Sequence, residues 1–315
     1  MITSKRHPIN FYFPLVFTVV MLTGIAFLSI GAAYEDDSLL KIIFAVIFSI
    51  IISTFLYYFV KLSFDDSPII KLDKDKISFD GLAYSLREID KIEYTGKHRT
   101  EKHFLRINYG EGARIYFKDG TTRTILDNTY SNTHEIKLYL KETVGKGGQT
   151  STQKAKAEEN LKNSTQFQEY KGYQFLSFSG VYILLIVGPA IYALLFKIEK
   201  LVMPNFLFFT IAILLWTILC SYFLHYFRLS ANHLVIKNHN LFWKKDTYNL
   251  SDIKEVVFEA SISARFGATG LRLITKDLKS KLYQADSLSN KKWLKLKSDL
   301  EKHGIRVRNE CISRD

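Results

Sequence analysis

The sequence predicts an integral membrane protein of mixed class, in which two transmembrane helical hairpins are each followed by a small, mostly β domain that ends in a helix. Three observations predict this fold class. Four uncharged apolar runs alternate with polar, lysine-rich stretches. Alternating apolar residues, which are typical of strands, follow the second run and the fourth run. The two halves of the chain also repeat the same pattern in the same order.

Each apolar run is long enough to cross a bilayer. At about 1.5 Å per residue, roughly 20 helical residues span a hydrocarbon core about 30 Å thick. The alternatives are a buried core helix for any run and a cleaved signal peptide for the first. The length of the runs favours retained, membrane-spanning helices. The four predicted spans are Phe11–Ala33, Ile42–Val60, Tyr173–Phe196 and Leu201–Phe227.

The distribution of Lys and Arg predicts the orientation of the chain. Lys5 and Arg6 precede the first run and Lys61 follows the second, whereas the loop at residues 34–38 carries only acidic charge. Because positive residues stay on the cytoplasmic side, we expect a multi-pass protein of the cell inner membrane. Its N-terminus and both soluble domains would then lie in the cytoplasm.

The domain boundaries follow from these runs. The residues that begin at Gly145 lack the GxxxxGK[ST] spacing of a phosphate loop, and we interpret them as a flexible linker. The chain is thus divided into a first transmembrane hairpin at residues 1–61, a first cytoplasmic domain at 62–144, a polar linker at 145–171, a second transmembrane hairpin at 172–227, a second cytoplasmic domain at 228–306 and a tail at 307–315.

The internal repeat lies in two pairs of segments. Leu72–Phe79 corresponds to Leu229–Ile236, and Tyr84–Tyr94 corresponds to Tyr248–Phe258. Each segment has the alternating apolar residues of a strand, and pairs such as Asp80-Gly81 and Asp119-Gly120 predict turns between strands.

A helix is expected at the end of each soluble domain. Asn132, followed three residues later by Glu135, matches the start of the first helix. Ser287 or Ser289 matches the start of the second, which Gly304 ends. The apolar face of the second helix consists of Trp293, Leu296 and Leu300.

These patterns together resemble bacterial pleckstrin-homology-like (PH-like) membrane proteins, which place two-helix hairpins before PH-like modules, sometimes in tandem. The resemblance rests on Leu229–Ile236, the turn at residues 238–240 and Tyr248–Phe258, with their counterparts Leu72–Phe79 and Tyr84–Tyr94. It implies that each soluble domain is a PH-like small β-barrel closed by its C-terminal helix, with a role in binding at the membrane. It implies no set of functional residues.

The ionisable residues form no catalytic or metal-binding motif. The eight His residues lack metal-ligand spacing, and neither HExxH nor CxxC occurs. His225, in the fourth run, is interpreted as an interfacial residue and not as part of a proton path. We therefore expect no enzymatic activity, no catalytic residues, no cofactor and no metal ion. The net charge of +12 fits an anionic membrane surface better than nucleic acid in a tethered protein.

The basic residues of the second soluble domain are the candidate contacts for anionic lipid or for a partner. A group of Lys residues beside a membrane attracts anionic headgroups, although a run of charges is more often a solvated face. The candidates are Lys244, Lys245, Lys291, Lys292 and Lys295.

The expected function is that of a non-enzymatic integral membrane protein. Its two PH-like modules would bind a protein partner, a second copy of the chain or anionic headgroups at the cytoplasmic face. The alternative is a subunit of a membrane transporter or channel. The apolar runs lack the intramembrane Asp, Glu, Lys or Arg that such proteins usually carry.

Overall fold

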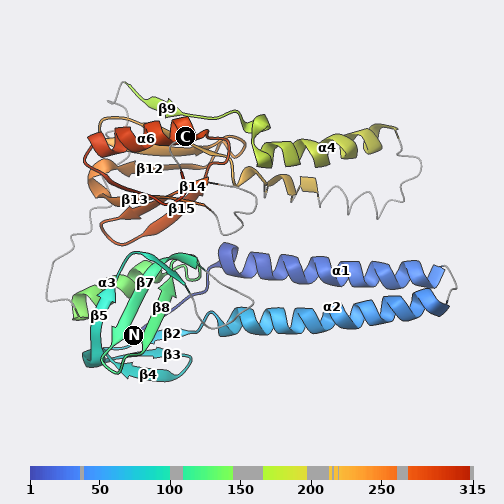
Figure 1. The fold of residues 1–315 in the computed structure, drawn as a ribbon, viewed down its shortest axis with the longest axis horizontal. Coiled ribbons are helices and arrows are strands. Elements are labelled where there is room, and N and C mark those ends of the chain that lie inside the picture. The colour runs from blue at the N-terminus through green and yellow to red at the C-terminus, as the bar shows by residue number, and fades with distance from the viewer. Residues whose placement is uncertain are drawn as a thin grey trace. The chain divides into compact units, whose positions relative to one another are not determined.

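The structure is a computed structural model that describes residues 1–35, 39–99, 109–144, 166–196, 213–214, 216–218, 220–260 and 269–312. The chain divides into two compact units, Met1–Gln149 and Thr150–Asp315 (Figure 1). Each unit has a hydrophobic core of its own, formed between its strands and its last helix.

Unit 1 begins with a strand, continues into two long helices and then forms two sheets. The first sheet has the strand order β1-β2-β3-β4. In the second sheet β7 lies between β5 and β6 and also pairs with β8. The elements are β1 (Ile2–Thr3), α1 (Phe13–Glu35), α2 (Leu39–Asp65), β2 (Ile70–Leu72), β3 (Lys76–Phe79), β4 (Leu82–Ser85), β5 (Ile89–Glu93), β6 (Lys97–Arg99), β7 (Tyr109–Phe117), β8 (Thr122–Leu126) and α3 (Thr133–Val144).

The predicted turns of unit 1 have the backbone that their residues favour. Asp80 and Gly81, between β3 and β4, have φ angles of 48° and 90°. Asp and Gly tolerate this left-handed region, which two-residue hairpin turns require. Gly120, between β7 and β8, has a φ angle of 84°. Alternate residues of β3 and β7, such as Ile77 and Ile115, then lie in the core with 0% exposure.

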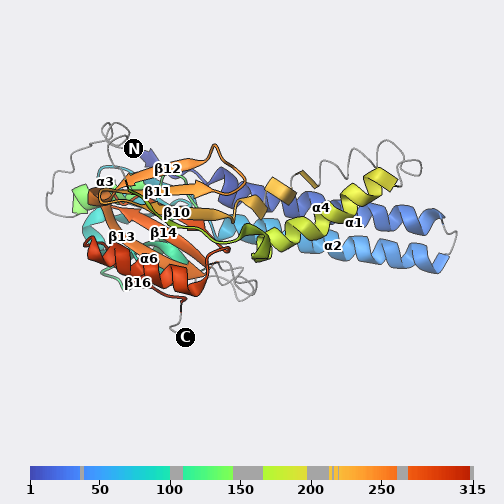
Figure 2. The same cartoon turned by 90° about the horizontal axis from the view of Figure 1, so that it is seen from above.

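Unit 2 also begins with a short strand that precedes an apolar helix, and it continues with two sheets and a helix, to which it adds β16. Its sheets have the strand orders β12-β11-β10-β9 and β15-β14-β13-β16, with β13 and β16 parallel (Figure 2). The elements are β9 (Gln168–Tyr170), α4 (Phe178–Phe196), β10 (His225–Leu229), β11 (His233–Asn238), β12 (Lys245–Asn249), β13 (Ile253–Ala260), β14 (Thr269–Thr275), β15 (Ser280–Gln284), α6 (Asn290–Lys302) and β16 (Arg306–Asn309).

In both units a short strand before the apolar helices pairs with the strand that follows them. Ile2 of β1 pairs with Leu72 of β2, and Tyr170 of β9 pairs with Phe227 of β10. The helical segment is thus an insertion between two neighbouring antiparallel strands. Consequently both ends of α1–α2 lie at the same edge of unit 1.

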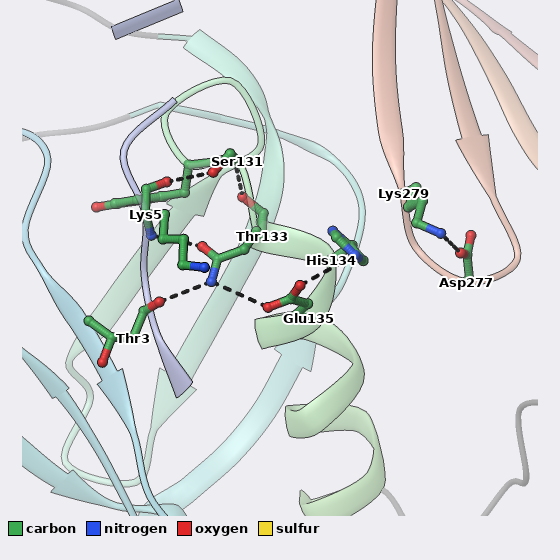
Figure 3. A network of polar contacts seen from close by, with 10 residues as sticks. Thr3, Lys5, Ser131, Thr133, His134, Glu135, Asp277 and Lys279 are labelled. Carbon is green, nitrogen blue, oxygen red and sulfur yellow. Dashed lines mark hydrogen bonds and ion pairs between the residues drawn. The ribbon is translucent and has the colours of Figure 1, made fainter. Parts of the chain in front are cut away.

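The N-terminal residues are further held by the start of α3. The side chain of Asn132 accepts a hydrogen bond from the Lys5 backbone N–H at 2.8 Å and donates one to the Thr3 carbonyl at 2.9 Å (Figure 3). Ser131 adds a backbone hydrogen bond to the Lys5 carbonyl at 2.8 Å. The residues before α1 are therefore part of the folded unit.

The prediction of four membrane spans is wrong for the residues that the structure describes, because only two of its helices are long and apolar enough to cross a membrane. These helices are Pro8–Gly31 and Leu39–Asp65. The third predicted span is shortened, because Gln174–Leu176 forms a separate 3-10 turn and α4 begins only at Phe178.

The fourth predicted span ends in a strand, and its residues 201–212 lie outside the described residues. His225 belongs to β10, and Leu224 and Phe227 have 0% exposure within the unit. A continuous apolar run does not distinguish a buried strand from a helix, which explains this error. His225 is accordingly not an interfacial residue of a helix.

The prediction of two closed barrels is also wrong, because the strands form four separate four-stranded sheets. The 3-10 turns Leu86–Glu88 and Leu250–Asp252 interrupt the chain between the two sheets of each unit. No backbone ladder joins the two sheets of either unit among the described strands. An isolated backbone bridge between Leu224 and Ala285 connects the ends of β10 and β15 in unit 2. Side chains also connect the sheets, as where Arg123 of β8 donates to the Tyr84 hydroxyl of β4 at 2.5 Å.

Candidate functional site

A cavity of about 240 Å³ lies in unit 2, between the β11–β12 turn and the outer strand of the second sheet. It is smaller than the roughly 300–1,000 Å³ typical of drug-sized ligands, so its size suits a small polar group. Its walls come from the chain just before β10, from β10, β11 and β12, from the turn and from β15. The lining residues are Tyr222, His225, Ile236, Trp243, Lys244, Lys245, Asp246, Lys281, Leu282 and Tyr283.

The β11–β12 turn is longer than its counterpart in unit 1. Residues 239–244 separate β11 from β12, whereas only residues 80–81 separate β3 from β4. The Asn238 side chain folds the longer turn, because its Oδ1 accepts the backbone N–H groups of Asn240 at 3.0 Å and Leu241 at 2.9 Å. Its Nδ2 donates to the Ser221 carbonyl at 2.7 Å. The turn is thereby attached to the end of the apolar segment.

Two aromatic side chains project from this turn into solvent. Phe242 is 82% exposed and Trp243 is 66% exposed, and their rings meet edge to face with centroids 4.9 Å apart. Burial of either ring would be favourable by about 1.5–3 kcal/mol, so this turn is a candidate contact surface.

A chain of hydrogen bonds joins the two sheets at the cavity wall. Tyr283 donates its only hydroxyl proton to Asp246 at 2.9 Å. Tyr248, whose oxygen lies 2.6 Å from that of Tyr283, is therefore the donor to Tyr283. Lys281 also binds Asp246 at 2.8 Å. Strands β12 and β15, the open edges of the two sheets, are thus held together by side chains.

The Asp246 carboxylate is the negative charge in the cavity wall, and it forms an ion pair with Lys281. Burial opposes the ionisation of Asp246. Its pKa nevertheless lies below the usual range, because Lys281 donates a hydrogen bond and supplies a positive charge and the Tyr283 hydroxyl donates a second hydrogen bond. Burial, followed by the neighbouring Tyr248 and Asp246, raises the pKa of Tyr283, which keeps this phenol protonated as a donor.

His225 is neutral in this environment. Burial is the main cause that lowers the pKa of His225 to about 4, and the charges of Lys244 and Lys281 lower it further. Its Nδ1 lies 2.9 Å from the Gln284 carbonyl, an acceptor, so Nδ1 carries the proton. His225 therefore adds no positive charge to the cavity.

Lys244 lacks a carboxylate partner among the described residues. Its ammonium group lies 3.9 Å from the centre of the Tyr222 ring, in a cation–π contact. Burial and then repulsion from Lys281 lower the pKa of Lys244. Three ammonium groups (Lys244, Lys245 and Lys281) face one carboxylate (Asp246) in the cavity wall. The cavity is therefore suited to bind an anion.

The structure separates the five predicted lysines into two groups. Lys244 and Lys245 line the cavity, whereas Lys291, Lys292 and Lys295 lie on the exposed side of α6 and do not line it. Lys292 donates to the Lys171 carbonyl. Sequence reasoning missed Lys281 and Asp246, which resemble ordinary solvated charges. Their only sequence signal is alternation with the core residues of two strands.

The described residues contain no group of three or more His, Cys, Asp or Glu side chains that could hold a metal ion. No protein-family model matches the chain, and no curated protein matches it. The resemblance to PH-like membrane proteins therefore remains a prediction.

Proposed function

We propose that this chain is a membrane-anchored, non-enzymatic binding protein, which α1 and α2 fix in the bilayer and whose folded units bind at the cytoplasmic face. The observation that carries the proposal is the exposure of these two helices. Their most apolar stretches are only 12% and 11% buried. A core helix of a soluble protein would be mostly buried, and so many apolar side chains are not stable in water.

The polar side chains of the two helices support a lipid environment. Ser29, Ser49 and Thr54 each donate their hydroxyl to the carbonyl four residues earlier, at 2.8 Å. In hydrocarbon no water is present to satisfy such groups, so bonds within the helix are required. No Asp, Glu, Lys or Arg interrupts the helices between residues 42 and 60 or between residues 13 and 34.

The base of the helical pair supports a hairpin with both ends on one side. Arg6 donates to the Ser67 carbonyl at 3.0 and 2.7 Å, and its guanidinium lies 4.7 Å from the centre of the Phe64 ring. The start of α1 and the end of α2 are thus joined by a cation. Because positive charge stays on the cytoplasmic side, this end of the hairpin faces the cytoplasm.

Alkaline extraction of membranes tests the anchoring. The full-length chain is expected to remain in the membrane pellet at high pH and to dissolve only in detergent. A variant that carries Ile47→Lys and Ile51→Lys should lose this property, because each cation near the bilayer centre costs about 2.5–3.5 kcal/mol. Lys74→Gln, at an exposed position between β2 and β3, is the control. Release of the unaltered chain by alkali alone would contradict the proposal.

A role as a transporter or channel subunit is favoured by no observation among the described residues. Uptake by proteoliposomes above that of empty vesicles would be needed to support it.

A further inference from the structure

The cavity of unit 2 lies where its apolar segment leaves and re-enters the folded unit. Asp286 joins the two ends, because its Oδ2 accepts the Ser179 backbone N–H at the start of α4 and its own N–H donates to the Phe223 carbonyl. The β11–β12 turn is attached here through Ser221, and Figure 2 shows this turn at the end of unit 2 from which α4 projects.

Exposed apolar side chains surround this end of unit 2. Phe242 and Trp243 project from the turn, and Phe175 and Leu176, just before α4, are 58% and 82% exposed. Aromatic rings next to cations are typical of the layer where headgroups meet hydrocarbon. The surroundings therefore favour a lipid over a soluble ion as the molecule that carries the bound anionic group.

We propose that the cavity beside the β11–β12 turn binds the phosphate of an anionic phospholipid headgroup. Lys244 and Lys245 supply positive charge for which the described residues offer no ion-pair partner, whereas Asp246 neutralises Lys281 and keeps it at the cavity wall. The exposed ring of Trp243 contacts the lipid beside the phosphate. This inference rests on the proposed anchoring at a membrane, and it adds the ligand class and the site.

The described residues of unit 1 form no equivalent site beside the β3–β4 turn, because that turn consists only of Asp80 and Gly81. It therefore lacks a counterpart of Phe242, Trp243 and Lys244. We accordingly assign the headgroup site to unit 2 alone.

Calorimetry on the full-length chain in neutral detergent tests the site. Short-chain phosphatidylglycerol is the probe, with short-chain phosphatidylcholine and inorganic phosphate as separate titrants. Phosphatidylglycerol should bind saturably, phosphatidylcholine much more weakly, and inorganic phosphate with a dissociation constant at least about tenfold higher. Lys244→Gln should weaken the binding of phosphatidylglycerol about fivefold, which corresponds to the loss of one well-placed cation.

Lys276→Gln is the matched control, because it removes the same charge from an exposed position in the β14–β15 turn outside the cavity. It should leave the dissociation constant of phosphatidylglycerol within about twofold of the unaltered value. Equal losses in the two variants would overturn the site, since they would indicate attraction by net charge. Equal affinity for phosphatidylcholine, or equally tight binding of inorganic phosphate, would overturn the headgroup assignment.

The two proposals fail in different experiments. A chain that resists alkali but shows none of these binding differences retains its anchoring and loses the headgroup site. A chain that alkali releases from the membrane loses the anchoring, whatever the calorimetry shows.

Discussion

The side-chain oxygen of Asn132 accepts the backbone N–H of Lys5 at 2.8 Å, which joins the first helical residues of α3 to the segment before α1. Asn132 is the residue that the sequence marks as the start of this helix, and its carbonyl does accept the N–H groups of Glu135 and Ile136. Its side chain, however, forms hydrogen bonds with the backbone of Lys5 and Thr3, before α1.

We predict that Asn132→Ala destabilises unit 1 by about 1–3 kcal/mol, because the change removes the buried side chain that bonds the Lys5 N–H and the Thr3 carbonyl. Thermal unfolding in detergent, followed by circular dichroism, measures the effect. Asn10→Ala, at an exposed position, is the control. Equal midpoints for the two variants would show that the N-terminal strand is not held by Asn132.

A buried ion pair in unit 1 gives the second prediction. Lys137 of α3 lies 2.6 Å from Asp127, and their side chains are 1% and 4% exposed. Lys137→Met or Asp127→Asn alone should cost about 3–5 kcal/mol, because each leaves or distorts a buried charge. The double variant Lys137→Met with Asp127→Asn should cost much less than the sum of the two single losses, because it leaves no buried charge. Additive losses in a double-mutant cycle would contradict this coupling.

Two glycines of unit 2 provide a matched pair for the third prediction. A Cβ atom on Gly172 would lie 1.6 Å from the Ser287 carbonyl oxygen, whereas one on Gly188 in α4 would meet nothing within 4 Å. Gly172→Ala should therefore destabilise unit 2 by about 1–3 kcal/mol. Gly188→Ala should be neutral or stabilising by up to about 1 kcal/mol. Unfolding midpoints in the opposite order would refute the close approach at Gly172.

The pH dependence of unit 2 gives the fourth prediction. Burial lowers the pKa of both His225 and His239 to about 4 in the folded chain. The unfolded chain, with a pKa near 6.5, therefore binds more protons at mildly acidic pH. Stability should be fully present above about pH 6.5 and should fall as the pH is lowered towards 4.

His225→Gln is the variant that tests this dependence, because its amide can still donate to the Gln284 carbonyl and does not titrate. The unfolding midpoint of this variant should fall less between pH 7 and pH 5 than that of the unaltered chain. His303→Gln, at the exposed residue that follows α6, should keep the original slope. A slope unchanged by His225→Gln would remove His225 as a source of the pH dependence.

The strands with strong alternation were predictable from the sequence. The segment Tyr84–Tyr94 forms the end of β4, a 3-10 turn and β5, and Tyr248–Phe258 forms the end of β12, a 3-10 turn and most of β13. In both segments apolar residues alternate over enough positions to fix which face is buried, and the preceding turn residues limit the register.

The remaining elements depend on contacts that no local pattern contains. Strands β1 and β9 have two and three residues, too few for periodicity, and are defined only by partners far along the chain. The apolar residues around Leu224 predict a helix, because a buried strand and a buried helix have the same apolar composition. No cavity was predicted from the sequence, although two of its lining residues, Lys244 and Lys245, were among the five candidate lysines. Lys281 reaches the cavity only through the side-chain contact of β15 with β12.

The location of the α1–α2 loop relative to unit 1 shows whether α1 and α2 form a hairpin that spans the membrane. In a chain with Cys220→Ala and Cys311→Ser, single cysteines are introduced as Leu39→Cys, at the start of α2, or as Lys74→Cys, on the surface of unit 1. A membrane-impermeant maleimide is applied to bacterial spheroplasts before and after lysis. Leu39→Cys should be labelled in intact spheroplasts and Lys74→Cys only after lysis. Labelling of both positions only after lysis would contradict a membrane-spanning hairpin, and labelling of Lys74→Cys in intact spheroplasts would contradict the cytoplasmic location of unit 1.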